Sequence, residues 1–148
     1  MPVSRIFLTR FFQLVTERKF AEAERMLERS KNRARKNEWN KGYFQALSGI
    51  LLAQRSNDDR YLFLPSINPT NDEELESLRR DFLEHTRSMT HANYDRGFFS
   101  AWSDYVRVLQ KFSSDKKQEN KKIREKQRVE VKSEVEIKAK KTVQTSLA

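Results

Sequence analysis

The fold of this chain can be read outward from residues 38–54, EWNKGYFQALSGILLAQ. Part of this stretch recurs 55 residues later, because residues 39–48 read WNKGYFQALS and residues 94–103 read YDRGFFSAWS. The identical pairs are Gly42 and Gly97, Phe44 and Phe99, Ala46 and Ala101, and Ser48 and Ser103. The chain therefore reads as an internal duplication, which says more about architecture than about activity.

A stripe of small side chains runs along the first copy when it is drawn as a helix. Gly42, Ala46, Gly49 and Ala53 fall at positions i, i+4, i+7 and i+11 and share one face. Glycine inside a helix costs about 1 kcal/mol relative to alanine, so two glycines on one stripe indicate a closely packed neighbouring backbone. An apolar ridge adjoins the stripe at Tyr43, Leu47, Ile50 and Leu51, and in the second copy at Phe98, Trp102, Tyr105 and Val106. Both helices should be central and mostly buried.

Apolar spacing and capping residues predict an all-α compact bundle of about five helices. The expected helices run from Ser4 to about Arg18, from about Phe20 to Lys36, from Glu38 to Arg55, from about Thr70 to Met89, and from His91 or Asn93 to Phe112. Phe12 and Ile6 widen the apolar stripe of the first helix, and Met89 ends that of the fourth. Residues 61–69 should form a packed apolar connection, because their prolines forbid a long helix. The domain would cover residues 3–112, with duplicated hairpins at 20–55 and 75–110.

Composition limits the function classes. Only three glycines and three prolines among 148 residues favour helix nearly throughout, and the absence of cysteine excludes a disulfide scaffold or a thiolate metal site. Neither a signal peptide nor an apolar membrane span is visible, so a cytoplasmic protein without membrane contact is expected. The two histidines, His85 and His91, have no metal-ligand spacing with carboxylates, and no phosphate-binding glycine loop occurs. No enzyme, metal, cofactor or small-molecule substrate is predicted.

The tail from Ser113 onward is charged and has few apolar anchors, so residues 113–148 are expected to be mostly disordered. Its first part offers seven basic residues for contact with a polyanion: Lys116, Lys117, Lys121, Lys122, Arg124, Lys126 and Arg128. The next part alternates with period two and places four apolar residues on one side of a strand: Val129, Val131, Val135 and Ile137. That segment is either solvated and disordered or adds a strand to a partner's sheet edge.

Residues 5–54 resemble a tetratricopeptide-type helical hairpin and the opening of its next repeat, and residues 72–112 resemble it more distantly. The set Phe20, Ala23 and Leu27 is similar to the start of that family's second helix, and Phe44-x-x-Leu47-Ser48 is similar to its repeat opening. Phe11 stands where the family has a small residue, Arg35 where it has proline, and the period is 55 residues. The resemblance implies a scaffold that binds peptides or proteins, with no activity carried over.

Basic residues concentrate in the first half of the chain. Residues 1–57 hold 12 Lys and Arg against 5 Asp and Glu, whereas residues 58–112 hold 7 against 10. The densest run contains Arg29, Lys31, Arg33, Arg35, Lys36 and Lys41, with the aromatic Trp39 among them. Such side chains neutralise phosphates while an aromatic ring stacks on a base; a solvated helix end or contact with an acidic protein are the alternatives.

The leading functional hypothesis is a non-enzymatic binding module for RNA or a ribonucleoprotein. It would act through this basic helix end and the tail. The alternative is a tetratricopeptide-like adaptor between proteins that makes no contact with nucleic acid.

Overall fold

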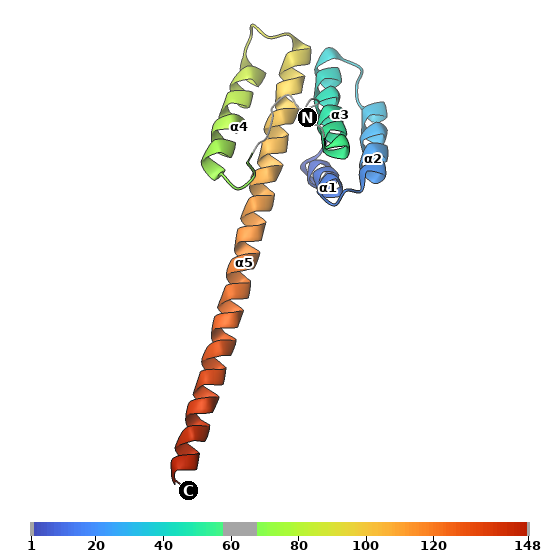
Figure 1. Ribbon diagram of the computed structural model, residues 1–148. Coiled ribbons are helices and arrows are strands. Elements are labelled where there is room, and N and C mark those ends of the chain that lie inside the picture. Colours follow the sequence, from blue (N-terminus) through green and yellow to red (C-terminus); the bar gives the residue numbers. More distant parts are fainter. Residues whose placement is uncertain (1, 58–67, 148) are drawn as a thin grey trace. The chain divides into compact units, whose positions relative to one another are not determined.

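The chain is all-α in the computed structural model, which describes residues 2–57 and 68–147. Its helices are α1 (Arg5–Thr16), α2 (Phe20–Arg33), α3 (Glu38–Ser56), α4 (Asp72–Arg87) and α5 (Asn93–Leu147), drawn in Figure 1. The prediction of an all-α chain of about five helices is confirmed. The chain divides into two compact units, Met1–Lys111 and Phe112–Ala148. Helix α5 contributes residues to both units. The apolar connection expected at residues 61–69 lies largely outside the described residues.

Short polar side chains start three of the helices. The Ser4 hydroxyl accepts a hydrogen bond from the Phe7 amide of α1 at 3.1 Å. Asn37 caps α3 by accepting from the Asn40 amide at 2.8 Å, and Asn71 caps α4 in the same way. Each cap satisfies one backbone donor that has no partner inside its helix.

The turn between α1 and α2 is a Schellman motif made without glycine. Arg18 takes a left-handed conformation with φ of 60°, and the Lys19 amide donates to the Leu14 carbonyl at 2.8 Å. A second hydrogen bond, from the Arg18 amide to the Val15 carbonyl at 3.1 Å, completes the pattern. The turn reverses the chain, so that α2 packs back against α1.

Helix α2 ends at Arg33, three residues before the expected end at Lys36. Ala34 is already extended, with ψ of 152°, and the Asn40 side chain donates to the Arg35 carbonyl at 2.7 Å. Because Asn37 must itself be extended to cap α3, the residues just before it leave the helix.

The core of the first unit is built mainly from aromatic and branched aliphatic side chains. Phe12 of α1 contacts Tyr105 of α5 with ring centroids 4.9 Å apart, and Phe82 of α4 lies 6.0 Å from Trp102 of α5. Two residues expected in the apolar stripes are exposed instead, Ile6 at 83% and Met89 at 89%. Met89 lies beyond the end of α4, where the helical spacing on which its assignment rested no longer applies.

Two glycines lie at one crossing of α3 and α5. A Cβ at Gly42 would overlap the carbonyl oxygen of Tyr94 and would lie 3.1 Å from the Phe98 nitrogen. A Cβ at Gly97 would overlap the carbonyl oxygen of Trp39 in the same way. The contacts are reciprocal, because Trp39 and Tyr94 each precede a glycine by three residues. The two backbones touch, and any side chain at either glycine would separate them.

A buried polar cluster also joins α3 to α5. The Tyr43 hydroxyl donates to Asp104 Oδ2 at 2.7 Å, and Arg107 Nη2 lies 2.9 Å from Asp104 Oδ1. Tyr43 is fully buried and Asp104 is 7% exposed. Burial raises the pKa of the Asp104 carboxyl, and this influence outweighs the hydrogen bond from Tyr43 and the charge of Arg107, which both lower that pKa.

The substitution Asp104→Asn should change how stability depends on pH. Because the pKa of Asp104 is higher in the folded chain than its ordinary value of 3.8, the folded chain holds this proton more tightly than the unfolded chain. The resulting stabilisation is complete below the unfolded pKa and is lost as pH rises through the folded pKa. Urea unfolding between about pH 4 and about pH 7 should show wild type losing free energy of unfolding relative to Asp104→Asn.

The exposed Asp81 of α4 offers a control, because Asp81→Asn removes the same charge outside the core. That variant should follow the pH profile of the wild type. A wild type that gained stability relative to Asp104→Asn as pH rises would show that the Arg107 ion pair, and not burial, dominates this carboxyl.

The tail is helical, which differs from the expected disorder. Helix α5 continues without interruption to Leu147. No glycine or proline follows Gly97, and Lys, Arg, Glu and Gln, which favour helix, dominate the sequence after Phe112. Acid–base pairs at i, i+4 such as Glu134 with Lys138 add support. High charge opposes a packed core, as the composition indicates, but it does not oppose a solvated helix.

The period-two segment is also helical and makes no strand. Its four apolar residues spread around the helix, and Val129, Val131, Val135 and Ile137 are 54–63% exposed. The β-branched side chains that suggested a strand lower helix propensity only slightly, and no other strand exists among the described residues to pair with this segment. No helix in residues 2–57 and 68–147 is long and apolar enough to span a bilayer.

Candidate nucleic-acid interface

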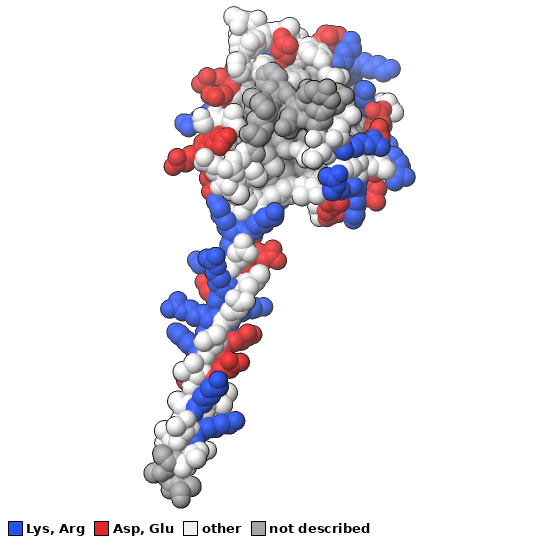
Figure 2. Space-filling view, viewed as in Figure 1, with Lys and Arg blue, Asp and Glu red and all other residues white. Residues whose placement is uncertain are grey.

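An open groove of about 540 Å³ lies between α1 and α2. Apolar side chains from both helices contribute to its lining: Phe7, Leu14 and Met26. The polar lining is mainly cationic and consists of Arg10, Glu22, Arg25, Arg29, Ser30 and Arg33. Four guanidinium groups against one carboxylate make this groove strongly positive. In Figure 2 Lys and Arg gather on the side of the first unit where α1 and α2 lie, and acidic side chains on the side of α4.

Helical spacing places the arginines in a row. Arg25, Arg29 and Arg33 step by four residues along α2, about 6 Å of axial rise each. The opposite face of α2 carries Ala23 and Leu27, both buried at 2% exposure or less. Burial of that face fixes the rotation of α2, and the arginine row is therefore held toward the groove and solvent.

These three arginines carry uncompensated charge. No acidic group in the described ranges 2–57 and 68–147 lies within ion-pairing distance of Arg25, Arg29 or Arg33. Like charges at i, i+4 destabilise a helix by about 0.2–0.5 kcal/mol per pair. The row is therefore unfavourable for α2 alone, and an anionic ligand would relieve the repulsion.

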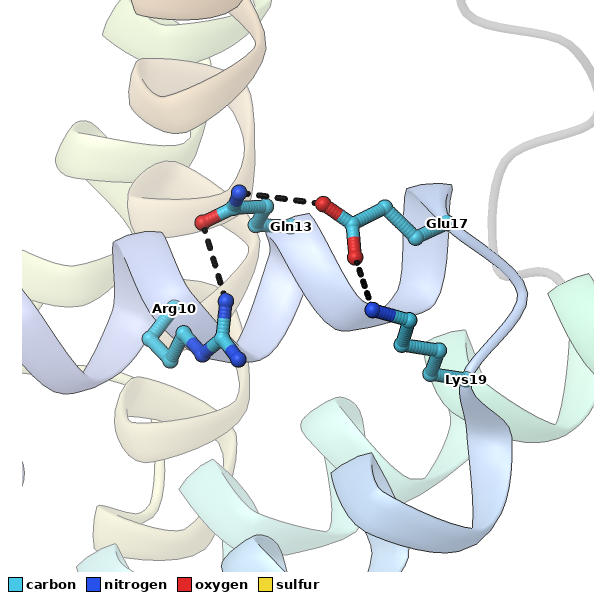
Figure 3. Close-up of polar contacts among 4 residues, drawn as sticks. All are labelled: Arg10, Gln13, Glu17 and Lys19. Atoms are coloured by element: carbon cyan, nitrogen blue, oxygen red, sulfur yellow. Dashed lines mark hydrogen bonds and ion pairs between the residues drawn. The ribbon is translucent and has the colours of Figure 1, made fainter.

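A chain of polar contacts on α1 leaves Arg10 available as the fourth cation (Figure 3). Arg10 Nη1 lies 3.5 Å from Gln13 Oε1, and the Gln13 amide donates to Glu17 at 3.0 Å. The other oxygen of Glu17 pairs with Lys19 at 3.0 Å. Hydrogen bonds, first from Lys19 and then from Gln13, lower the pKa of Glu17 and keep it ionised. The nearby carboxylate is thus paired directly with Lys19. Arg10 acts on Glu17 only through its charge, and its direct contact is with the neutral amide of Gln13.

A second pocket, of about 470 Å³, lies where α2 gives way to α3. Its lining consists of Pro2, Ala34, Arg35, Asn37, Trp39 and Asn40. The indole of Trp39 is half-buried and stacks on the Tyr43 ring, with centroids 5.2 Å apart and an interplanar angle of 15°. The pocket follows the groove directly in sequence, since Arg33 ends one lining and Ala34 begins the other.

The residues predicted from the basic run separate into four groups. Arg29 and Arg33 line the groove, and Arg35 and Trp39 line the second pocket. Lys36 is exposed in the connection to α3 and belongs to neither lining. The remaining two are engaged in ion pairs on their own helices, Lys31 with Glu28 at 4.0 Å and Lys41 with Glu38.

The local density of basic residues does not single out Arg10 or Arg25, which lie outside the densest run. A signal for Arg25 exists, since it precedes Arg29 by four residues and so shares its helix face. Arg10 carries no comparable signal, because its position depends on how α1 packs against α2.

The seven basic residues from Lys116 to Arg128 are all exposed on α5, within the second unit. Acidic residues alternate with them, and Figure 2 shows both charges along this helix. These basic side chains lie on a regular helix, whereas the sequence predicts that this segment is mostly disordered.

The two histidines lie together at the α4–α5 connection. His85 Nδ1 is 3.0 Å from His91 Nε2, and the His85 ring stacks on Phe99 with centroids 4.5 Å apart. In the part of the chain that the structure describes, no three His, Cys, Asp or Glu side chains gather in a metal-binding arrangement.

No protein-family model, characterised protein or solved structure matches this chain.

Proposed function

We propose that the protein is a non-enzymatic binding module for RNA, free or within a ribonucleoprotein. The observation that carries the proposal is the arginine groove, defined as the groove lined by Arg10, Arg25, Arg29 and Arg33. Guanidinium groups are the preferred partners of phosphate, because they are always charged and present several donors in a planar fork. A row with one arginine per helical turn suits a ligand whose negative charges also repeat, which is the character of a nucleic-acid strand.

The basic side chains of α5 support a polyanion over a small anion. Residues 113–148 hold 11 Lys and Arg against 6 Asp and Glu. Exposed cations of this kind raise the local concentration of a polyanion and the rate of its capture, without a specific contact. In this proposal the arginine groove provides the fixed contact and the basic residues of α5 the diffuse attraction.

A duplicated helical-hairpin scaffold, similar to the tetratricopeptide type, is part of the same proposal. The reciprocal crossing of Gly42 and Gly97 supports it, because each glycine meets the residue that precedes the other glycine by three positions. The repeated motif would then serve to join the two halves of the first unit.

The arginine row belongs to the first hairpin alone. The positions 55 residues after Arg25, Arg29 and Arg33 hold one arginine, one acid and one serine, namely Arg80, Glu84 and Ser88. In this proposal the duplicated scaffold is therefore shared by both halves, whereas phosphate binding is confined to the first.

A salt titration tests the proposal. Fluorescence anisotropy of a labelled single-stranded RNA should report binding that weakens steeply with salt. Four phosphate contacts predict a slope of log K against log salt of about −3 and a loss of roughly 50-fold between about 50 mM and about 200 mM salt. The basic residues of α5 would steepen this slope further.

Absence of binding at the lowest salt, or affinity that does not respond to salt, would contradict the proposal. When the protein is purified from its own cells, nuclease treatment should remove the RNA that is bound to it. If a protein partner stays bound both at high salt and after nuclease treatment, and no RNA binds, the protein would instead be an adaptor between proteins.

A further inference from the structure

The pocket at the α2–α3 junction has the features of a nucleobase site. It follows the arginine groove without a gap in sequence, and its volume of about 470 Å³ lies within the usual range of ligand sites, roughly 300–1,000 Å³. Its side chains differ in kind from those of the groove, because an indole and two carboxamides take the place of the arginine row.

The aromatic part of the pocket is a pre-arranged platform. Trp39 stacks on Tyr43, and Tyr43 is fully buried and held by its hydrogen bond to Asp104 at 2.7 Å. The backbone carbonyl of Trp39 is also fixed at the glycine crossing by Gly97. An indole held in this way loses little conformational freedom when a base stacks on it.

The carboxamides present one donor and one acceptor that no hydrogen bond among residues 2–57 and 68–147 occupies. Asn40 uses its amide nitrogen to donate to the Arg35 carbonyl at 2.7 Å, which leaves its Oδ1 available. Asn37 uses its Oδ1 to accept from the Asn40 backbone at 2.8 Å, which leaves its amide nitrogen available. A donor and an acceptor in one pocket complement the edge of a base, which also carries both kinds of group.

Arg35 adds a positive charge at this pocket. It is exposed, and no acid in the described part of the chain forms an ion pair with it. It stands two residues beyond Arg33, the last arginine of the groove. The pocket therefore offers a cation, an aromatic ring and two carboxamides to a strand that also contacts the arginine row.

We propose that the pocket lined by Arg35, Asn37, Trp39 and Asn40 holds one unpaired nucleobase of the strand whose phosphates occupy the arginine groove. This inference rests on the proposed function and narrows its ligand to single-stranded nucleic acid. A duplex cannot present an unstacked base to the indole, so paired RNA should bind through its phosphates alone.

The test compares two strands of equal charge. One probe is a short oligoadenylate, and the other is an abasic oligomer with the same number of phosphates. The wild type should bind oligoadenylate about 10-fold more tightly than the abasic strand, as expected for one stacked base. Oligoadenylate, and not the abasic strand, should quench the emission of Trp39, whereas Trp102 is 2% exposed and should give a constant signal.

Two variants assign the effect to the indole. Trp39→Leu should bind both probes equally, while Trp39→Phe should keep most of the preference for oligoadenylate and lose the quenching. Circular dichroism must show that both variants are folded, because Trp39 packs on Tyr43. The wild-type comparison of the two probes does not depend on either variant.

The outcomes separate this inference from the proposed function. If both probes bind the wild type equally, with salt dependence but without quenching, the base pocket is refuted and phosphate binding remains. If neither probe binds the wild type, the base pocket and the proposed function both fail. Equal affinity for a duplex and a single strand of matched charge would also refute the base pocket.

Discussion

Substitution of Arg25, Arg29 and Arg33 together by glutamine should reduce the affinity for single-stranded RNA more than ~100-fold at low salt. Hydrogen bonds to charged groups contribute about 1.5–3 kcal/mol each, and three of the four groove arginines would be lost. The slope of log K against log salt should become shallower by about 2 units, since each phosphate contact accounts for roughly 0.7 units on a single strand. Anisotropy titrations at several salt concentrations measure both quantities.

The helix itself should tolerate the change. Glutamine has a helix propensity close to that of arginine, and removal of the like-charged row should leave stability unchanged or slightly higher. A matched control is the triple substitution of Arg80, Arg87 and Lys111 by glutamine, which removes the same charge from exposed positions of α4 and α5. If the two triple variants lose affinity equally, net charge explains the binding and the arginine groove has no special role.

Substitution of Gly42 by leucine should lower the free energy of unfolding by about 3 kcal/mol or more. The first side-chain carbon already overlaps the Tyr94 carbonyl oxygen, so the backbones of α3 and α5 must separate. Overpacking of a well-packed core typically costs about 1–3 kcal/mol and occasionally more, and a backbone overlap places this substitution at the upper end. The gain in helix propensity over glycine, up to about 1 kcal/mol, offsets only part of this cost. The melting temperature should fall by about 10 °C or more.

Gln45 provides the control for this substitution, because it is exposed on the same helix. Gln45→Leu should change stability by no more than about 0.5 kcal/mol. Gly97→Ala should also destabilise, since its side chain would meet the Trp39 carbonyl. A Gly42→Leu variant that melts like the wild type would show that α3 and α5 do not touch at this point in solution.

Helices with a buried face could be predicted from the sequence because their apolar residues recur with helical spacing. Leu8, Phe11 and Leu27 lie in the core where that spacing puts them. Ile6 lies on the edge of its stripe and is exposed, since the stripe fixes the middle of a buried face better than its limits. The end of α2 was placed too late, because the cap formed by Asn37 competes with continuation of the helix.

The candidate site could be predicted only in part. Charge density pointed to the C-terminal end of α2 and found Arg29, Arg33 and Arg35. It also included Lys31 and Lys41, because a count of charges does not register their pairing with Glu28 and Glu38. The groove depends on contacts between α1 and α2 that no local pattern encodes.

Helix α5 has a buried part and a fully exposed part within one continuous helix. Ala101 and Val106 are fully buried, whereas every residue from Ser114 to Thr145 is exposed. Local opening costs little where few apolar groups are buried, so the amide protons of the exposed part exchange with solvent by fraying from the C-terminal end. Those of the buried turns exchange only when the first unit opens as a whole. One helix thus spans both extremes of local stability, with the boundary near Phe112.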